Sequence, residues 1–415
     1  MIVALAVAAV LALGPLPAVE APLPPGNPPR VPVSGLLAPD ACEDTGGAPG
    51  PRASDPQLAG LGLDAAHRIA TGRGVRIAVI DTGIAPHPRL AGRVTGLGDY
   101  VRGGSGLEDC DGHGTAVAGL LAGAPSADDW FRGVAPDATL LSIRHSSRAY
   151  TLGGSSGGVG DLGTLADALV LAVRAGADVV NVSEAGCVTI AQAEEAAPPL
   201  RTALRFAAER GVVVVAAAGN VGKEACADGQ VPLPGWLGEN VLTVGALDAR
   251  GGPATFGVRG PWVDVAALGT GLTTLGVPAG FTRDPVRGTS FAAPLVAGTA
   301  ALLKQQRPDA SAREIVETIV ATARPLPSVP RDAVGSGVVD PVAALARTPT
   351  ADTAAAQAPP AVPDPPPTGR PTAPLPGLGR PAEVEAPLSP GVAVAIVVAC
   401  MAALPLVVRS LRRRP

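Results

Sequence analysis

The chain has 415 residues, of which 47% are apolar, so it can bury a sizeable core in one large domain with appendages or in two domains. Its formal net charge of −4 gives no basis for a nucleic-acid partner. Glycine (53 residues) and proline (45) are so frequent that a single one is weak evidence for a turn or a helix end.

The two ends of the chain predict its compartment. An apolar run over residues 2–13 suits the core of a signal peptide, here predicted over 1–21, and is too short to span a bilayer. Residues 391–408 carry no charge and are long enough for a transmembrane helix. The arginines of the tail, 409–415, predict that this end is cytoplasmic. The part between the two segments is therefore predicted to be extracytoplasmic.

Composition divides the rest into three parts. Residues 22–58 are rich in proline, glycine and alanine, and we predict an extension without a core of its own. Residues 347–390 are dominated by proline and predict a disordered linker that spaces the folded part from the membrane. Between them, residues 59–346 alternate apolar strands with helices and predict a single domain.

That alternation predicts an α/β fold of three layers, with a mostly parallel sheet covered by helices on both faces. Active sites in such sheets lie beyond the carboxyl ends of the strands, where Asp81 and Asn220 are expected. The predicted strands are 74–81, 138–144, 177–183, 212–220, 240–247 and 262–268, and the predicted helices are 165–176, 200–211, 290–306 and 311–323.

Four cysteines fall in the predicted exported part, where an oxidising compartment favours disulfides. They allow three pairings, and pairing by nearness in the sequence gives Cys42–Cys110 and Cys187–Cys226. The sequence has no C-x-x-C and no paired-histidine spacing, so it does not favour a zinc site. We predict no cofactor and no required metal.

Four polar residues occupy positions that call for an explanation. Asp81 and Asn220 close apolar strands, His113 lies between two glycines, and Ser290 begins a helix of small residues. Taken singly, each has an ordinary explanation, such as a turn, a structural histidine or a helix cap. Together they supply what acyl transfer needs: a nucleophile, a base, a carboxylate to orient the base, and an oxyanion donor.

The tripeptide Asp-Thr-Gly suggests a different enzyme, because aspartic proteases carry it once in each of two β-rich lobes. It occurs here at Asp44 and at Asp81. The two copies are too close in the sequence for two lobes, and Asp44 does not follow an apolar strand. We therefore predict that Asp81 is not half of a carboxylate pair.

Four segments resemble the signature blocks of subtilisin-like serine proteases, in the family's order of Asp, His and Ser. They are IAVIDTGI (77–84), DGHGTAVAG (111–119), VVVVAAAGN (212–220) and RGTSFAAPLVAG (287–298). The signal peptide, the short extension, Cys110, the proline-rich linker and the anchor resemble the mycosins, which are membrane-anchored proteases of type VII secretion systems. This resemblance implies cleavage of secreted protein substrates, support of the membrane-embedded secretion complex, and an extension that wraps around the domain. The alternative is a mainly structural component with little proteolytic turnover.

The resemblance also implies a role for each site residue. Ser290 is expected to be the nucleophile, His113 the base and then the acid, Asp81 the group that orients His113, and Asn220 an oxyanion donor. A Gly/Ser-rich loop over 145–163 is expected to overhang the cleft. The expected substrate-binding residues are Ser142, Ile143, Arg144, Ser183, Glu184, Ala185 and Gly186 along an extended substrate, with Ala216, Ala217, Ala218 and Gly219 on one wall of the specificity pocket.

Overall fold

A seven-stranded sheet forms the centre of the molecule, and all of its strands are parallel. The computed structural model describes residues 21–28, 32–51, 56–153, 158–184, 186–222 and 226–348. In spatial order the strands are β11 (Val265–Leu268), β10 (Leu242–Leu247), β8 (Val213–Ala217), β6 (Val179–Val182), β2 (Arg76–Asp81), β4 (Thr139–Arg144) and β3 (Val94–Asp99).

The central strands are mainly apolar because both faces of the sheet are buried there, whereas the edge strand β3 is only partly buried. In β2, Ile77 and Val79 point into one hydrophobic core, and Ala78 and Ile80 point into a second core on the other face. Such alternation follows from the two-residue period of a strand. The predicted α/β architecture is confirmed.

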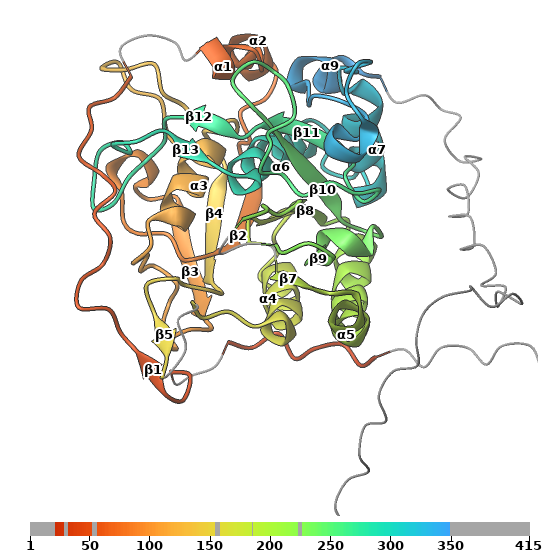
Figure 1. Ribbon diagram of the computed structural model, residues 1–415. Coiled ribbons are helices and arrows are strands. Elements are labelled where there is room, and N and C mark those ends of the chain that lie inside the picture. Colours follow the sequence, from red (N-terminus) through yellow and green to blue (C-terminus); the bar gives the residue numbers. More distant parts are fainter. Residues whose placement is uncertain are drawn as a thin grey trace, which may run out of the picture. The chain divides into compact units, whose positions relative to one another are not determined.

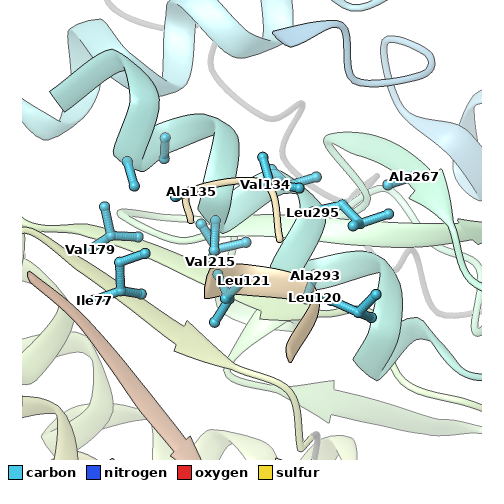
Figure 2. Close-up of a cluster of buried hydrophobic side chains, with 14 of the residues drawn as sticks. Ile77, Leu120, Leu121, Val134, Ala135, Val179, Val215, Ala267, Ala293 and Leu295 are labelled. Carbon is cyan, nitrogen blue, oxygen red and sulfur yellow. The ribbon is translucent and has the colours of Figure 1, made fainter. Parts of the chain in front are cut away.

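Helices cover the two faces in separate layers (Figure 1). One layer contains α3 (His113–Ala122), α6 (Thr289–Gln306), α7 (Ala312–Thr322) and α9 (Pro341–Ala346), and the other contains α4 (Leu162–Arg174) and α5 (Ile190–Glu209). Figure 2 shows the first core, where Ile77, Val179 and Val215 of the sheet meet Leu121 and Leu295 of the helices.

Short elements complete the described part of the chain. Three two-stranded antiparallel ladders join β1 (Leu36–Leu37) to β5 (Thr151–Leu152), β7 (Gly186–Thr189) to β9 (Gln230–Leu233), and β12 (Thr270–Leu272) to β13 (Val286–Arg287). The remaining helices are α1 (Pro56–Ala59), α2 (Leu63–His67) and α8 (Arg331–Val334), with 3₁₀ turns at η1 (Pro88–Leu90) and η2 (Gly235–Leu237).

Helix α5 begins at Ile190, ten residues before the predicted start at 200. Pro198 and Pro199 lie inside this helix. Proline removes a helical hydrogen bond and usually ends a helix. Here a capping box secures the first turn: the Thr189 hydroxyl accepts from the Gln192 backbone, and the Gln192 side chain accepts from the Thr189 backbone.

The N-terminal extension lies along the domain wherever it is described. The Gly26 backbone donates to Asp167 Oδ1 at 2.9 Å, and β1 pairs with β5. Further along, the Gly46 backbone donates to the carbonyl of Val277 at 2.8 Å, and Ala48 forms a bridge with Phe281. These contacts hold the extension against several separate parts of the domain.

The predicted signal peptide (except for its last residue), transmembrane helix 391–408 and tail 409–415 lie outside the described residues, as does nearly all of the linker 347–390. None of the helices in the part of the chain described here combines the length and the apolar character needed to cross a membrane.

Candidate active site

Asp81 and His113 meet at the carboxyl edge of the sheet. Asp81 is the last residue of β2 and its side chain is fully buried, while His113 opens α3 and keeps 19% of its side chain exposed. His113 Nδ1 donates to Asp81 Oδ1 at 2.7 Å, and the Thr82 backbone donates to the same oxygen at 2.7 Å. The carboxylate therefore orients the ring, and the other ring nitrogen is left for chemistry.

Glycines allow this close approach of strand and helix. A Cβ on Gly114 would lie 2.0 Å from the carbonyl oxygen of Gly83, so no other residue fits between β2 and α3 at that point. Gly112 before the histidine has φ 73°, in the left-handed region that favours glycine. The glycines on both sides of His113 are thus explained by backbone packing.

Asp109 ties the end of β2 to the start of α3 and was not predicted from the sequence. Its Oδ1 accepts from the Thr82 hydroxyl and from the Gly112 backbone, both at 2.8 Å. Its Oδ2 accepts from the backbone and hydroxyl of Thr115 at 2.8 and 2.7 Å. Thr82 in turn accepts from the Gly114 backbone at 2.9 Å. The available signal was a buried acid just before a helix start, where it satisfies free N–H groups.

Ser290 and Asn220 lie together beside the first turn of α6. Asn220 Oδ1 accepts from the Thr289 backbone at 3.0 Å and from the Thr289 hydroxyl at 3.1 Å. Because these bonds use the amide oxygen, the amide nitrogen is the group that can face a developing oxyanion. The Asn220 nitrogen and the Ser290 hydroxyl lie 3.5 and 3.6 Å from the place that a Cβ of Gly288 would occupy.

The Ser183 side chain holds the backbone of Ser290 through a hydrogen bond. Its hydroxyl donates to the carbonyl oxygen of Ser290 at 2.8 Å and accepts from Asn181 Nδ2 at 2.7 Å. Both supporting residues are buried. The Ser183 side chain, which was predicted to contact substrate, therefore positions the start of α6, although Ser183 also lines a cavity.

Three titratable groups have altered acidity here. Burial works against the charged form of His113, but the charge and hydrogen bond of Asp81, with the charge of Glu184, raise the pKa of His113 to about 9. Burial raises the pKa of Glu184 to about 7. Burial also raises the pKa of Asp109 to about 6, against the hydrogen bonds from Thr115 and Thr82. Such clustering is typical of functional sites.

Two cavities open on either side of the Ser290 helix start. The larger, of about 470 Å³, is lined by His113 and by Glu43, Asp44 and Thr45 of the extension. The smaller, of about 320 Å³, lies between Gly158–Asp161 and Ser183–Gly186. Ser290, Asn220, Glu184 and Arg148 line both cavities. Ser290 therefore lies where the two cavities adjoin.

The prediction for Ser142, Ile143 and Arg144 is wrong. These residues lie inside β4, where they pair with β2 on one side and β3 on the other, so their backbone has no free edge for a substrate strand. All three side chains are buried, and Arg144 pairs with Asp99. Both ends of the Gly/Ser loop line the smaller cavity, His145–Arg148 at one end and Gly158–Asp161 at the other.

The prediction that Ala216–Gly219 form one wall of the specificity pocket is only partly correct. Ala216, Ala217 and Ala218 are buried at the end of the interior strand β8 and contribute no cavity surface, whereas Gly219 lines the smaller cavity. Glu184 and Gly186 line it as predicted. Ala185 lies outside the described residues.

Both predicted disulfides are present, Cys42–Cys110 and Cys187–Cys226. The first links the extension to the segment just before His113. Close by, Asp44 forms an ion pair with Arg283 at 2.8 Å and no carboxylate pair with Asp81.

Within the described residues, one group has the spacing of metal ligands: Asp81, His113 and Glu184. A metal there would compete with the hydrogen bond between Asp81 and His113. That no metal is required stays a prediction.

Comparison with known proteins agrees with this geometry. Residues 72–350 match the Subtilase family. The chain is 42% identical over 365 residues to mycosin-4 of Mycobacterium tuberculosis, and the match covers 81% of this chain and 79% of that protein. It is 37% identical to subtilisin Savinase of Lederbergia lenta, over 68% of this chain and 94% of that protein.

Solved structures are similar as well. The MycP3 protease from the type VII (ESX-3) secretion system superposes with a TM-score of 0.68 at 37% identity, covering 78% of this chain and 96% of that one. A chain of the intact ESX-5 inner membrane complex gives a TM-score of 0.70 at 31% identity, covering 94% of this chain and 98% of that one.

Proposed function

Because the chain belongs to the subtilase family of serine proteases and, within it, to the mycosins of type VII secretion systems, we propose that it is a membrane-anchored extracytoplasmic endopeptidase. It cleaves peptide bonds of secreted proteins and supports the secretion complex. The observation that carries the proposal is the Asp81–His113 hydrogen bond beside cavities that also expose Ser290 and Asn220.

In the acylation step, the Ser290 hydroxyl oxygen attacks the substrate carbonyl carbon, and His113 Nε2 takes the hydroxyl proton. Asp81 holds the opposite ring nitrogen and stabilises the imidazolium that forms. The carbonyl oxygen becomes an oxyanion, and the Asn220 amide and the Ser290 backbone N–H donate to it. His113 then protonates the leaving amine, and the C–N bond breaks.

Deacylation repeats these steps with water. His113 removes a proton from the water, which attacks the acyl-enzyme, and the same donors hold the second oxyanion. Collapse of this intermediate breaks the ester bond, and His113 returns the proton to Ser290. No metal or cofactor takes part in any step.

The membrane part of the proposal rests on the sequence and on a relative. Residues 391–408 are apolar and uncharged, and four arginines follow them. The similar chain in the ESX-5 inner membrane complex matches 94% of this chain, a share that extends past the protease domain. We expect residues 1–21 to be removed on export and the C-terminus to be cytoplasmic.

A fluorophosphonate probe tests the catalytic part, because it reacts only with an activated serine. Wild type should label, and Ser290→Ala, a change of one oxygen atom, should not. Failure of folded wild type to label would refute the proposal.

Complementation of a deletion strain tests the second candidate function, a mainly structural component. The long match to a chain of a membrane complex favours that candidate. If Ser290→Ala restores secretion as fully as wild type does, support of the complex does not need proteolysis. If it restores none while the protein level is normal, proteolysis is required for secretion.

A further inference from the structure

Glu184 brings a second carboxylate close to the catalytic pair. It follows β6 directly after Ser183 and lines both cavities. One of its carboxylate oxygens lies within 4.8 Å both of a ring nitrogen of His113 and of a carboxylate oxygen of Asp81. The triad needs one carboxylate to orient its histidine, so this additional acid calls for another explanation.

The Glu184 carboxylate is held in place, and no ion pair with another of the described residues neutralises it. The hydroxyl of Ser146 donates to it, which fixes its position. The charges that act on it most strongly come from Asp81 on β2, His113 on α3, and Asp111 and Arg148 on the loops beside them. Within the described residues, Arg148 is the one permanent cation of this set, and its side chain is exposed. Among the described residues, no buried permanent cation stands beside this carboxylate, so a substrate cation could take that place.

The Glu184 carboxylate also affects the pKa of His113, which is the base in the proposed mechanism. A negative charge near an imidazole stabilises the imidazolium. His113 is surrounded by Asp81 and Glu184, which stabilise its charge, and by Arg148, which opposes it, and the balance raises its pKa to about 9. With a pKa of about 9, only a minor fraction of the ring is neutral at pH 7 and able to accept the Ser290 proton, so Ser290 reacts slowly there. Neutralising Glu184 would lower the pKa of His113 and free the base.

We propose that Glu184 selects substrates that carry a lysine or arginine side chain beside the scissile bond, and that the bound cation, by neutralising Glu184, releases His113 to act as the base. The proposal rests on the proposed function and names the substrate class of that site. A neutral or acidic segment would bind less tightly and would leave His113 protonated. Specificity and activation thus depend on one carboxylate.

Binding to the Ser290→Ala chain tests selection without any turnover. The full-length protein in detergent is titrated with alanine-glycine octapeptides that carry one arginine, or one citrulline of the same shape, at each position in turn. At one position we expect arginine to bind about tenfold more tightly or better, since a hydrogen bond to a charged group is worth about 1.5–3 kcal/mol. Adding Glu184→Gln should remove this preference, because the amide keeps the shape and the bond from Ser146.

The pH dependence of fluorophosphonate labelling tests release of the base. The labelling rate of wild type should rise with pH towards the pKa of His113, because only the neutral ring activates Ser290. Glu184→Gln should move the midpoint about one unit lower and label faster than wild type at neutral pH. Glu43→Gln is the matched control: it removes the same charge from the cavity wall, but Glu43 is not among the main charges acting on His113.

The two measurements separate the possible failures. Equal binding of arginine and citrulline peptides at every position, or a preference that survives Glu184→Gln, would overturn the selection. An unchanged midpoint in a Glu184→Gln protein that melts like wild type would overturn the release of His113. Absence of any labelling of wild type would instead overturn the proposed function, while the binding measurement would still decide whether Glu184 recognises a cation.

Discussion

Replacing Asp109 tests whether this buried acid fixes the start of α3 and thereby positions His113. The carboxylate accepts four short hydrogen bonds, two at each oxygen, from Thr82, Gly112 and Thr115. Asparagine has the same shape but only one acceptor oxygen, so one side of the network meets an NH₂ group instead.

The expected cost follows from the donors that lose their acceptor. The hydroxyls of Thr82 and Thr115 can rotate, but the backbone N–H of either Gly112 or Thr115 is left unsatisfied in the Asn variant, which costs about 1–3 kcal/mol. Asp109→Ala leaves both N–H groups unsatisfied and should cost about 2–6 kcal/mol. Because His113 follows Gly112 directly, a small displacement of the ring should also lower kcat by about tenfold to a hundredfold, with little change in KM.

Urea unfolding of the full-length protein, followed by tryptophan fluorescence, measures the stability, and peptide hydrolysis gives kcat and KM. Thr115→Val is a milder control, because it keeps the backbone bond to Asp109 and removes only the hydroxyl, which donates to Asp109 and accepts from the Ala85 backbone. Wild-type stability together with wild-type kcat in Asp109→Ala would refute the reasoning that this network positions His113.

Three further changes give distinct outcomes. Asn220→Ala should lower kcat by about 10²–10³ with KM nearly unchanged, since it removes an oxyanion donor; an equal change confined to KM in steady-state kinetics would contradict this role. Replacing both Cys42 and Cys110 by alanine opens a disulfide that spans 68 residues and should cost about 4 kcal/mol in urea unfolding, and an unchanged midpoint would argue against it. Arg144→Ala leaves Asp99 buried without its ion-pair partner and should lower the free energy of unfolding by about 3–5 kcal/mol. A variant that is as stable as wild type but prefers different peptides would show instead that Arg144 contacts the substrate.

The sequence predicted six of the seven strands of the sheet and pointed to the candidate catalytic residues because each has a local signal. An apolar run that ends on a polar residue marks the carboxyl end of a buried strand, as at Asp81, and the glycines around His113 mark a close approach of two backbones. The order of these residues along the chain then identified the family.

The substrate strand was mispredicted because strand order is not a local property. Strand β3 contains Gly96 and Gly98 and is only partly buried, so its sequence does not alternate or form an apolar run. Without it, β4 would have a free edge at Ser142–Arg144. The observed pairing of β3 with β4 closes that edge, and Gly158–Gly160 line the cavity beside Ser290 instead.

The supporting role of Ser183 and the link that Asp109 makes to β2 were missed for a related reason. Both depend on hydrogen bonds to residues in other segments, Asp109 to Thr82 and Ser183 to Ser290. A polar side chain in a short loop is compatible with many such partners. Only the three-dimensional arrangement selects among them.

Mapping the site of covalent modification tests the central claim most directly. After reaction of the full-length protein with a fluorophosphonate, trypsin should release residues 288–304 with one adduct on Ser290, because cleavage follows Arg287 and Lys304. The adduct should be absent in His113→Ala, which lacks the base. An adduct on a different serine, or equal modification of Ser290 without His113, would contradict the assignment of Ser290, His113 and Asp81 as a catalytic triad.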